Sequence, residues 1–382
     1  MTERLYYNDC YLREFQARVV AVSDDGRRVW LDRTAFYPTS GGQPFDAGTL
    51  GGAAVVDVVD EDDRVVHVVD APVTLGDVTG EVDWTRRFDH MQQHTGQHLL
   101  SAVFEELYKI GTVSFHMGAT LSTIDVSAGV DTKQIERVEE RCAEIVAEAR
   151  PVLITFEDAS ADLGLRKVSE RTGTLRIVSI GGLDRSACGG THVRSTAEIG
   201  AVQIRKLEKI RGTTRVEFVC GMRALRAARA DFRLLAEISR TLSTPFEEIP
   251  ALVAAQIEKT KTLEKNCVRL STELARREGG ELHSATPAGE DGVRRVTQKG
   301  PIDDAARARA QAFIAGGKAV FLAICEDPAS VLLAASADSG MHAGNRVKEA
   351  VSAAGGRGGG NQTLGQGSVP ANALEGVVAA LS

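Results

Sequence analysis

The chain has 382 residues, of which 43% are hydrophobic and 25% charged, with a formal net charge of −7. This length predicts two to four domains, and the acidic balance excludes a globally basic nucleic-acid binder. Six scattered cysteines, no signal-peptide pattern and no apolar run near the ~18 residues of a membrane span predict a cytoplasmic protein with reduced thiols and no membrane contact.

Residues 1–85 contain short valine-rich segments that turn signals separate. The segments 17–22, 28–31, 53–59 and 64–69 are typical of strands, and no helical period of useful length accompanies them. A small β-barrel is the expected closure for so many short strands. The loop 36–48 holds the pair Gly41-Gly42, followed by Gln43. Adjacent glycines allow a backbone to approach a ligand closely, although a tight turn is the simpler explanation of an isolated pair.

Residues 86–222 have the pattern of a mixed α/β unit. Apolar residues recur at helical period over 90–109, with Gly111 as the expected helix end, and over 133–149, which Pro151 ends. The remaining segments are predicted strands: 112–116, 119–126, 152–156, 175–180, 201–209 and 214–220.

Two residue pairs in this unit predict a metal site. His94 and His98 lie four residues apart on the predicted helix and therefore project from one face. Cys188 and His192 have the same spacing, and together the four side chains form a plausible tetrahedral Zn²⁺ set. A metalloprotease would need glutamate where Thr95 stands. A purely structural zinc remains an alternative, although about 90 residues separate the two pairs and structural ligands usually cluster in short knuckles.

Residues 223–280 have the pattern of long charged helices with breaks near Pro245 and Pro250, which predicts a helical hairpin or a coiled-coil arm and a dimer contact. A linker is expected over 279–292, and an α/β pattern follows. The stretch 355–367 is rich in glycine and contains Arg357. It is either a flexible loop or a row of backbone amides that can lie against a phosphate backbone.

A basic run lies beside the predicted metal site. Between residues 205 and 233 there are nine basic and three acidic residues, a local balance of 9 − 3 = +6 in an acidic protein. Such a run is usually a solvated face. Its position next to a metal site and a helical arm favours a polyphosphate ligand.

Taken together, the motifs resemble one family. His94-x-x-x-His98 and Cys188-Gly-Gly-Thr-His192 are similar to the editing domain of alanyl-tRNA synthetases and of the free-standing AlaX-type trans-editing proteins. The loop 36–43 resembles the glycine-rich motif of the preceding β-barrel, and 355–367 resembles the C-terminal DHHA1 module. The resemblance implies an α+β multidomain protein with a β-barrel (1–85), a zinc-binding editing domain (86–222), a helical arm (223–280) and a DHHA1-like tRNA-binding domain (281–382).

The resemblance also implies an activity and its residues. The expected reaction is hydrolysis of the ester that joins serine or glycine wrongly to tRNA for alanine, in a site where Zn²⁺ is bound by His94, His98, Cys188 and His192. His116 and Thr95 are the candidate catalytic residues, and Thr95 could equally bond to its own helix turn. The residues expected to contact tRNA are Gly41, Gly42, Gln43, Arg357, Gly358, Gly359 and Gly360.

Two other functions stay open at this point. The two metal motifs also occur in the domain that edits serine attached to tRNA for threonine, although the barrel loop and the glycine-rich tail favour alanine. A non-catalytic tRNA-binding protein with structural zinc would carry the same ligands. A homodimer through the arm or the C-terminal domain is expected in either case.

Overall fold

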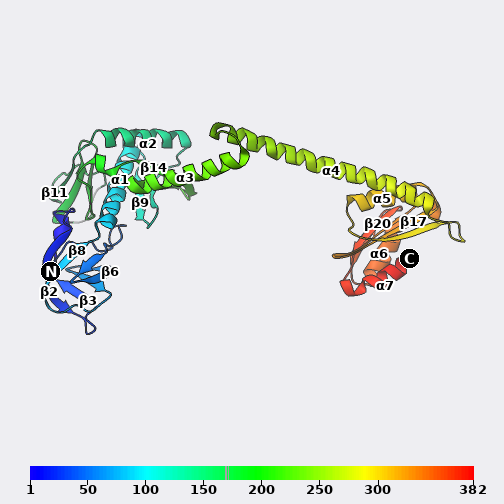
Figure 1. Cartoon of the computed structure of the whole chain (residues 1–382), viewed down its shortest axis with the longest axis horizontal. Coiled ribbons are helices and arrows are strands. Elements are labelled where there is room, and N and C mark those ends of the chain that lie inside the picture. The colour runs from blue at the N-terminus through cyan, green and yellow to red at the C-terminus, as the bar shows by residue number, and fades with distance from the viewer. Residues whose placement is uncertain (168–169, 171) are drawn as a thin grey trace. The chain divides into compact units, whose positions relative to one another are not determined.

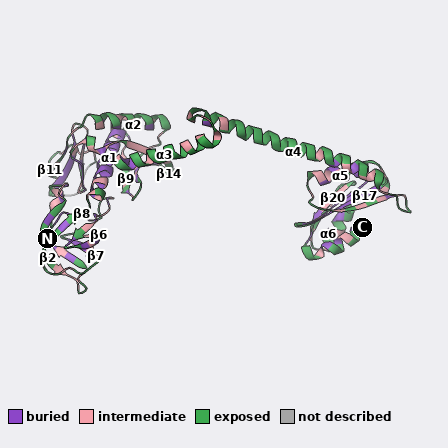
Figure 2. Cartoon of the chain, in the orientation of Figure 1, coloured by how far each residue is buried: buried purple, intermediate pink, exposed green. Residues whose placement is uncertain are grey.

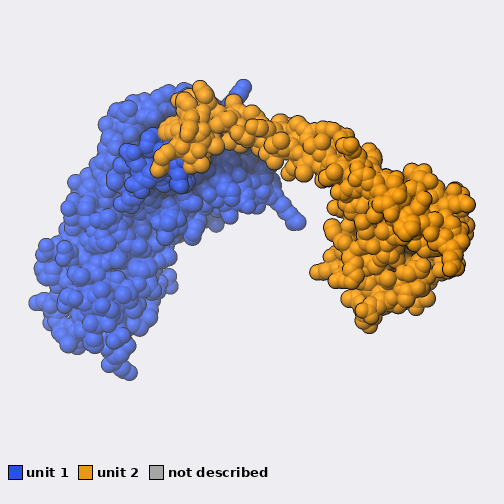
Figure 3. All heavy atoms as spheres, turned by 45° about the vertical axis from the view of Figure 1, so that its right-hand side comes forward, with its two compact units in different colours: residues 1–237 blue, residues 238–382 orange. Residues whose placement is uncertain are grey.

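The computed structural model describes residues 1–167, 170 and 172–382. It divides the chain into two compact units, residues 1–237 and residues 238–382, which Figure 3 colours separately. Each unit combines helices with its own sheets, which confirms the predicted α+β multidomain class. None of the described helices has both the length and the apolarity that a membrane span requires.

Six strands of the first unit close into a barrel (Figure 1). Inward residues alternate with outward ones, as in β2, where Phe15, Ala17 and Val19 are buried. The order is β2 (Glu14–Val22), β3 (Arg28–Leu31), β7 (Arg64–Val69), β6 (Ala53–Glu61), β5 (Gly48–Leu50) and β8 (Gly76–Val82). Two further short strands, β1 (Glu3–Arg4) and β4 (Arg33–Thr34), pair in parallel.

The central helix of the first unit, α1 (Trp84–Tyr108), is longer than the sequence pattern predicted. It begins six residues earlier, because the Asp83 side chain accepts the Arg86 N–H and so caps the helix. It ends at Tyr108, followed by Lys109 in the left-handed conformation (φ 56°) as the C-cap, and not at Gly111 as expected. Nearly every residue from Arg87 to Phe104 is buried, so polar side chains in this stretch must find partners inside the protein.

Two sheets enclose α1 together with α2 (Thr132–Ala147). Their shared core contains Leu99, Phe104, Ile124, Val138 and Phe218, all fully buried. One sheet has the order β14 (Val202–Ile210), β15 (Thr213–Cys220), β10 (Ser122–Val126), β9 (Thr112–Met117). The other has the order β11 (Val152–Asp158), β12 (Thr174–Ile180), β13 (Asp184–Ala187).

A buried ion pair joins the barrel to α1. Arg87 Nη2 lies 2.5 Å from Asp46 Oδ2, and both side chains are fully buried. The same guanidinium donates to the carbonyl oxygens of Cys10 and Ala35, so each of its three nitrogens has an acceptor. Because these partners come from the barrel side, the glycine-rich loop is fixed against the helix that carries His94.

The predicted arm is helical, with α3 (Gly221–Leu242) followed by α4 (Ile249–Ala285). Pro250 lies in the first turn of α4, where its missing N–H costs nothing, so it starts the helix and does not break it. Figure 2 shows α4 exposed along most of its length. Residues 279–285 were expected in a linker but continue α4. Gly279 permits close packing on α5 (Asp304–Ala315), where an added Cβ would lie 2.3 Å from the Arg309 carbonyl oxygen.

A five-stranded sheet forms the core of the second unit, and α6 (Ala343–Ala353) and α7 (Leu374–Leu381) share its apolar core. The glycine-rich stretch is a hairpin of this sheet and not a flexible loop, because Gly358 pairs with Gly367 and Gly360 with Gly365. An added Cβ at Gly365 would lie 2.6 Å from the Ala343 carbonyl oxygen, so the glycine allows α6 to pack closely. The strand order is β16 (Arg294–Lys299), β17 (Ala319–Glu326), β18 (Ala329–Ala335), β20 (Leu364–Ser368), β19 (Arg357–Gly360).

Candidate metal centre

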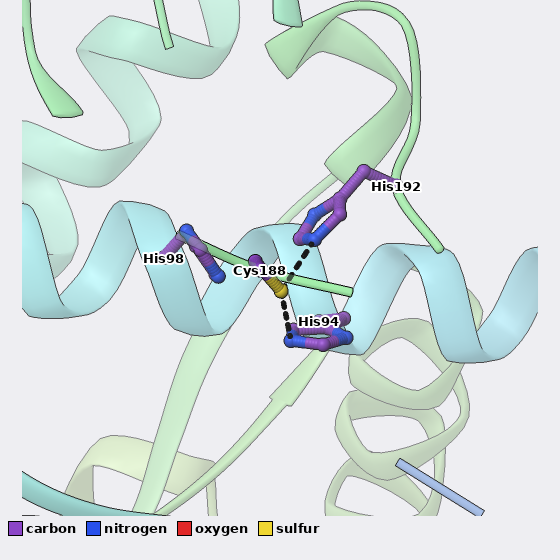
Figure 4. A group of neighbouring side chains, drawn as sticks. All are labelled: His94, His98, Cys188 and His192. Atoms are coloured by element: carbon purple, nitrogen blue, oxygen red, sulfur yellow. Dashed lines mark hydrogen bonds between the residues drawn. The ribbon is translucent and has the colours of Figure 1, made fainter. Parts of the chain in front are cut away.

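The two predicted pairs meet in the first unit (Figure 4). His94 and His98 project from one side of α1, and Cys188 and His192 come from the loop after β13. One donor atom from each of the four residues lies within 4.8 Å of all the others. The Cys188 Sγ atom is 3.4 Å from His94 Nε2 and 3.3 Å from His192 Nε2. The cluster could therefore hold a metal ion.

The distances and donor types suit zinc in particular. Zinc–nitrogen bonds of about 2.0 Å and zinc–sulfur bonds of about 2.3 Å give tetrahedral edges of roughly 3.3–3.8 Å. The two Cys188–histidine separations fall in this range. Three imidazoles and one thiolate are also ligands that zinc prefers over calcium or magnesium, which take oxygen.

Gln43 fixes the orientation of His94. Its Oε1 atom accepts hydrogen bonds from His94 Nδ1 at 2.8 Å and from the Thr191 N–H at 3.1 Å, and its Nε2 donates to Thr191 Oγ1. A backbone N–H can only donate, so the atom facing it is the amide oxygen, and His94 carries its proton on Nδ1. The lone pair of Nε2 then faces the cluster. Gln43 was expected to contact tRNA, but it is fully buried.

Asp184 does the same for His98. Its Oδ2 lies 3.0 Å from His98 Nδ1, while Oδ1 receives a hydrogen bond from Arg166 Nε at 2.7 Å. Burial opposes a charge on His98, but Asp184 and Cys188 raise the pKa of its imidazole to about 9. A carboxylate behind a histidine is a common support for metal ligands. The sequence contained no signal for this residue, because Asp184 becomes relevant only when β13 lies beside α1.

Thr95 supports the third histidine. Its Oγ1 lies 3.1 Å from His192 Nδ1 and accepts the Val193 N–H at 3.1 Å. A threonine oxygen can accept two hydrogen bonds, so it can hold His192 with Nε2 toward the cluster. Thr95 is fully buried, and both of these hydrogen bonds join its Oγ1 to the loop that carries His192. The structure therefore gives Thr95 a positioning role, and its catalytic role stays a prediction.

Arg176 holds the loop that carries the thiol. Its Nη1 donates to the carbonyl oxygens of Cys188 at 2.6 Å and Gly190 at 3.0 Å. Gly190 lies directly against His94, where an added Cβ would be 2.1 Å from the ring carbon Cε1. Burial opposes ionisation of the thiol, but the imidazoles of His94 and His192 lower the pKa of Cys188 well below its ordinary value. The loop therefore presents a thiolate, the form that binds metal.

A cavity of about 980 Å³ opens onto the cluster. His94, His98 and Cys188 lie in its wall. The barrel region contributes aromatic side chains and Gly41, and β9 contributes Thr112–Phe115. Its volume suits a ligand of nucleotide size. Other lining residues include Arg4, Tyr7, Tyr37, Pro38, Ser40, Gln97, Thr112, Ser114, Phe115 and Arg166, and the acidic Glu3, Asp60, Asp62 and Asp63.

The other predicted site residues lie elsewhere. His116 is exposed on β9 and does not line the cavity, whereas its neighbour Phe115 packs on the His94 ring with centroids 5.3 Å apart. Gly42 is pressed against Phe115, where an added Cβ would lie 2.9 Å from the carbonyl oxygen. Arg357 and Gly358–Gly360 form strand β19 in the second unit. In the basic run, Arg205, Arg215 and Arg223 form ion pairs with Asp231, Asp125 and Asp89.

Comparison with known proteins agrees with this geometry. Residues 175–217 match the sequence family described as the threonyl and alanyl tRNA synthetase second additional domain. The chain is 32% identical to alanyl-tRNA editing protein AlaX-L of Pyrococcus horikoshii, over 98% of this chain and 96% of that protein. It is 32% identical to alanyl-tRNA editing protein Aarsd1-A of Xenopus laevis over 70% of each, and 33% identical to an alanine–tRNA ligase of Pyrococcus abyssi over 72% of this chain and 32% of the ligase. The chain belongs to the family of alanyl-tRNA editing proteins.

Proposed function

We propose that this protein is a trans-editing aminoacyl-tRNA hydrolase that removes serine or glycine from mischarged tRNA for alanine in the cytoplasm. The observation that carries the proposal is the His94–His98–Cys188–His192 cluster in the wall of a 980 Å³ cavity. Relatives named as alanyl-tRNA editing proteins, one of them similar over nearly the whole chain, support the substrate class.

We propose Zn²⁺ as the ion that the four residues hold. When bound, zinc supplies a Lewis acid that can polarise an ester carbonyl or lower the pKa of a bound water to about 7. Gln43, Asp184 and Thr95 keep the three imidazoles oriented, so little reorganisation is needed when substrate arrives. In the reaction, a water oxygen bonds to the acyl carbon, the ester C–O bond breaks, and the ribose hydroxyl receives a proton.

The cavity walls would hold the acylated end of the tRNA. Tyr7 offers aromatic surface for the terminal base, and Gly41 lets the RNA approach the barrel backbone. His116 is exposed outside this cavity, so we leave it out of the proposed catalytic set.

We further propose that the second unit binds the tRNA body. Arg357 and Gly358–Gly360 form an edge strand whose outward backbone groups and guanidinium can meet phosphates. The proposed functional division is then 1–85, 86–222, 223–285 and 286–382, with the arm extended to the observed end of α4. The exposed apolar residues of α4 are proposed to pair with a second copy of the chain.

The decisive experiment offers four substrates to the purified protein. These are serine, glycine and alanine esters of tRNA for alanine, and the serine ester of tRNA for threonine. Release of serine and glycine with alanine spared is expected. If none of the four substrates is deacylated, the enzyme proposal is wrong and a non-catalytic tRNA-binding protein is favoured. Release of serine from tRNA for threonine alone would favour the threonine editor, an alternative that the shared threonyl and alanyl domain match keeps relevant.

Metal analysis tests the ligand set separately. Zinc content measured by mass spectrometry should be about one per chain in the wild type. Substitution of Cys188→Ala or His98→Ala should remove it. Unchanged zinc in both variants would exclude the proposed ligands even if the protein hydrolyses its substrate.

A further inference from the structure

Helix α3 carries a row of arginines toward solvent. Arg226, Arg229 and Arg233 are spaced by three and four residues and therefore lie within about 60° of one another around the helix. Asp231 marks the opposite side, because it pairs with Arg205 of β14 at 2.5 Å. All three arginines are exposed, and no ion pair with any described residue neutralises them.

The row leads into a groove beside the metal cavity. Arg226 lines this groove of about 670 Å³ together with Arg86 and Arg223, so that three guanidinium groups face the carboxylates of Asp83 and Asp89. The groove and the metal cavity share no lining residue. Because Arg223 is already paired with Asp89 at 2.7 Å, Arg86 and Arg226 remain in the groove with the single carboxylate of Asp83, a net charge of +1 there.

The groove lies one helical turn from the metal ligands. His90 lines the groove and His94 the cavity, and four residues of α1 advance about 6 Å along its axis. One hydrogen bond joins two residues that line neither pocket: the Met117 N–H donates to the Gly42 carbonyl oxygen at 3.0 Å. On either side of it, Gly41 faces the cavity and Pro44 the groove. A strand with its last nucleotide at the metal could place neighbouring phosphates here.

We propose that this groove and the arginine row of α3 bind the sugar–phosphate backbone of the acceptor end of the tRNA whose 3′ ester lies in the metal cavity. The inference rests on the proposed function for the position of that ester. Charge complementarity favours RNA over a protein partner, because the net charge of the chain is −7 and three unpaired arginines on one helix face form a local exception.

The test removes the row in the full-length, zinc-loaded protein. Binding of uncharged tRNA for alanine is measured by fluorescence anisotropy across a series of KCl concentrations. The triple variant Arg226→Gln, Arg229→Gln, Arg233→Gln should bind roughly 10- to 100-fold more weakly, and the slope of log K against log salt should fall by about 2–3. In deacylation assays the loss should appear in KM more than in kcat. Lysine at the same three positions should restore the salt slope.

A matched control separates this surface from a general loss of charge. Arg18, Arg27 and Arg64 are exposed on the barrel, and their triple glutamine variant changes the net charge equally. It should bind tRNA as the wild type does. An unchanged salt slope in the α3 variant, or an equal change in the barrel variant, would overturn the inference. A wild type that binds tRNA through this row but hydrolyses no ester would overturn only the proposed function.

Discussion

Gln43 Oε1 accepts a hydrogen bond of 2.8 Å from Nδ1 of His94, although one residue belongs to the barrel loop and the other to helix α1. The same oxygen accepts the N–H of Thr191, which lies next to the ligand His192. One barrel side chain therefore supports both halves of the candidate metal centre. The glycine-rich loop suggests an RNA contact by itself, but through Gln43 it also orients a candidate metal ligand.

Substitution of Gln43→Leu should weaken zinc binding by about 10- to 100-fold, because His94 would lose the acceptor that fixes its tautomer and ring orientation. Competition with a chromophoric chelator measures the affinity. Gln43→Glu keeps an acceptor and is the matched control, with an expected loss of a few-fold. Equal zinc affinity in the leucine variant and the wild type would contradict the supporting role.

The two glycines between Cys188 and Thr191 should differ sharply in their tolerance of alanine. At Gly190 the new Cβ would lie 2.1 Å from His94 Cε1, so the ring or the loop must move. At Gly189 the nearest atom is the Tyr7 hydroxyl at 3.6 Å, an ordinary contact. Gly190→Ala should therefore lose zinc and deacylation together, while Gly189→Ala should retain both within about twofold. Loss of zinc in both variants would mean that the zinc loss comes from a change in the loop backbone and not from the contact with His94.

The four candidate ligands could be found from the sequence because each pair has local spacing. His94 and His98 share a face because they lie four residues apart on a helix, whatever the tertiary structure is, whereas Cys188 and His192 lie close together in one short loop. Their supports could not be found in this way. Asp184 and Gln43 reach His98 and His94 only through the packing of β13 and the barrel loop on α1. His116 was placed in the pocket from the resemblance alone, and the alternation of β9 leaves it exposed.

The elements of the fold differ in the same way: those with a clear local pattern could be predicted, and those that depend on tertiary packing could not. The helices α2 and α4 carry a clear helical period and were predicted. β5 has only three residues, and the Gly76–Val82 strand of the barrel has two glycines, so neither has a strong strand pattern. The start of α1 was missed because its first turn mixes Trp84 with Thr85, Arg86 and Arg87 and so shows no clear apolar period, and the cap at Asp83 depends on a single hydrogen bond. The glycines of 355–367 suggested flexibility, whereas they serve the packing of α6.

His67 should make the barrel sensitive to acid. It is fully buried, and burial lowers its pKa from 6.5 to about 4, although the hydrogen bond to the Val29 carbonyl acts in the opposite direction. Between pH 6.5 and 4, His67 is therefore protonated in the unfolded chain and neutral in the folded barrel. The free energy of unfolding falls as pH falls through this window. The full effect is about 3 kcal/mol, at about 1.4 kcal/mol for each pKa unit.

His67→Gln should remove this part of the pH dependence. Urea unfolding followed by tryptophan fluorescence, at pH 7 and pH 4 in the presence of a chelator, gives the change for each protein. The wild type should lose up to about 3 kcal/mol more than the variant on acidification. Identical losses would show that His67 is protonated in the folded barrel or that another group accounts for the acid response.

The arm should control the oligomeric state. Leu263 and Leu270 of α4 are more than half exposed and lie seven residues apart, with Cys267 between them at the intermediate position of a heptad. Leu263→Glu with Leu270→Glu should convert a dimer to a monomer in sedimentation analysis, because two charges would be buried at the seam. Lys265→Glu with Thr272→Glu alters the far side of the same helix and should leave the dimer intact.

If the chains are parallel, mild oxidation should also cross-link the wild type through Cys267. A wild type that is monomeric at micromolar concentration would refute the paired arm.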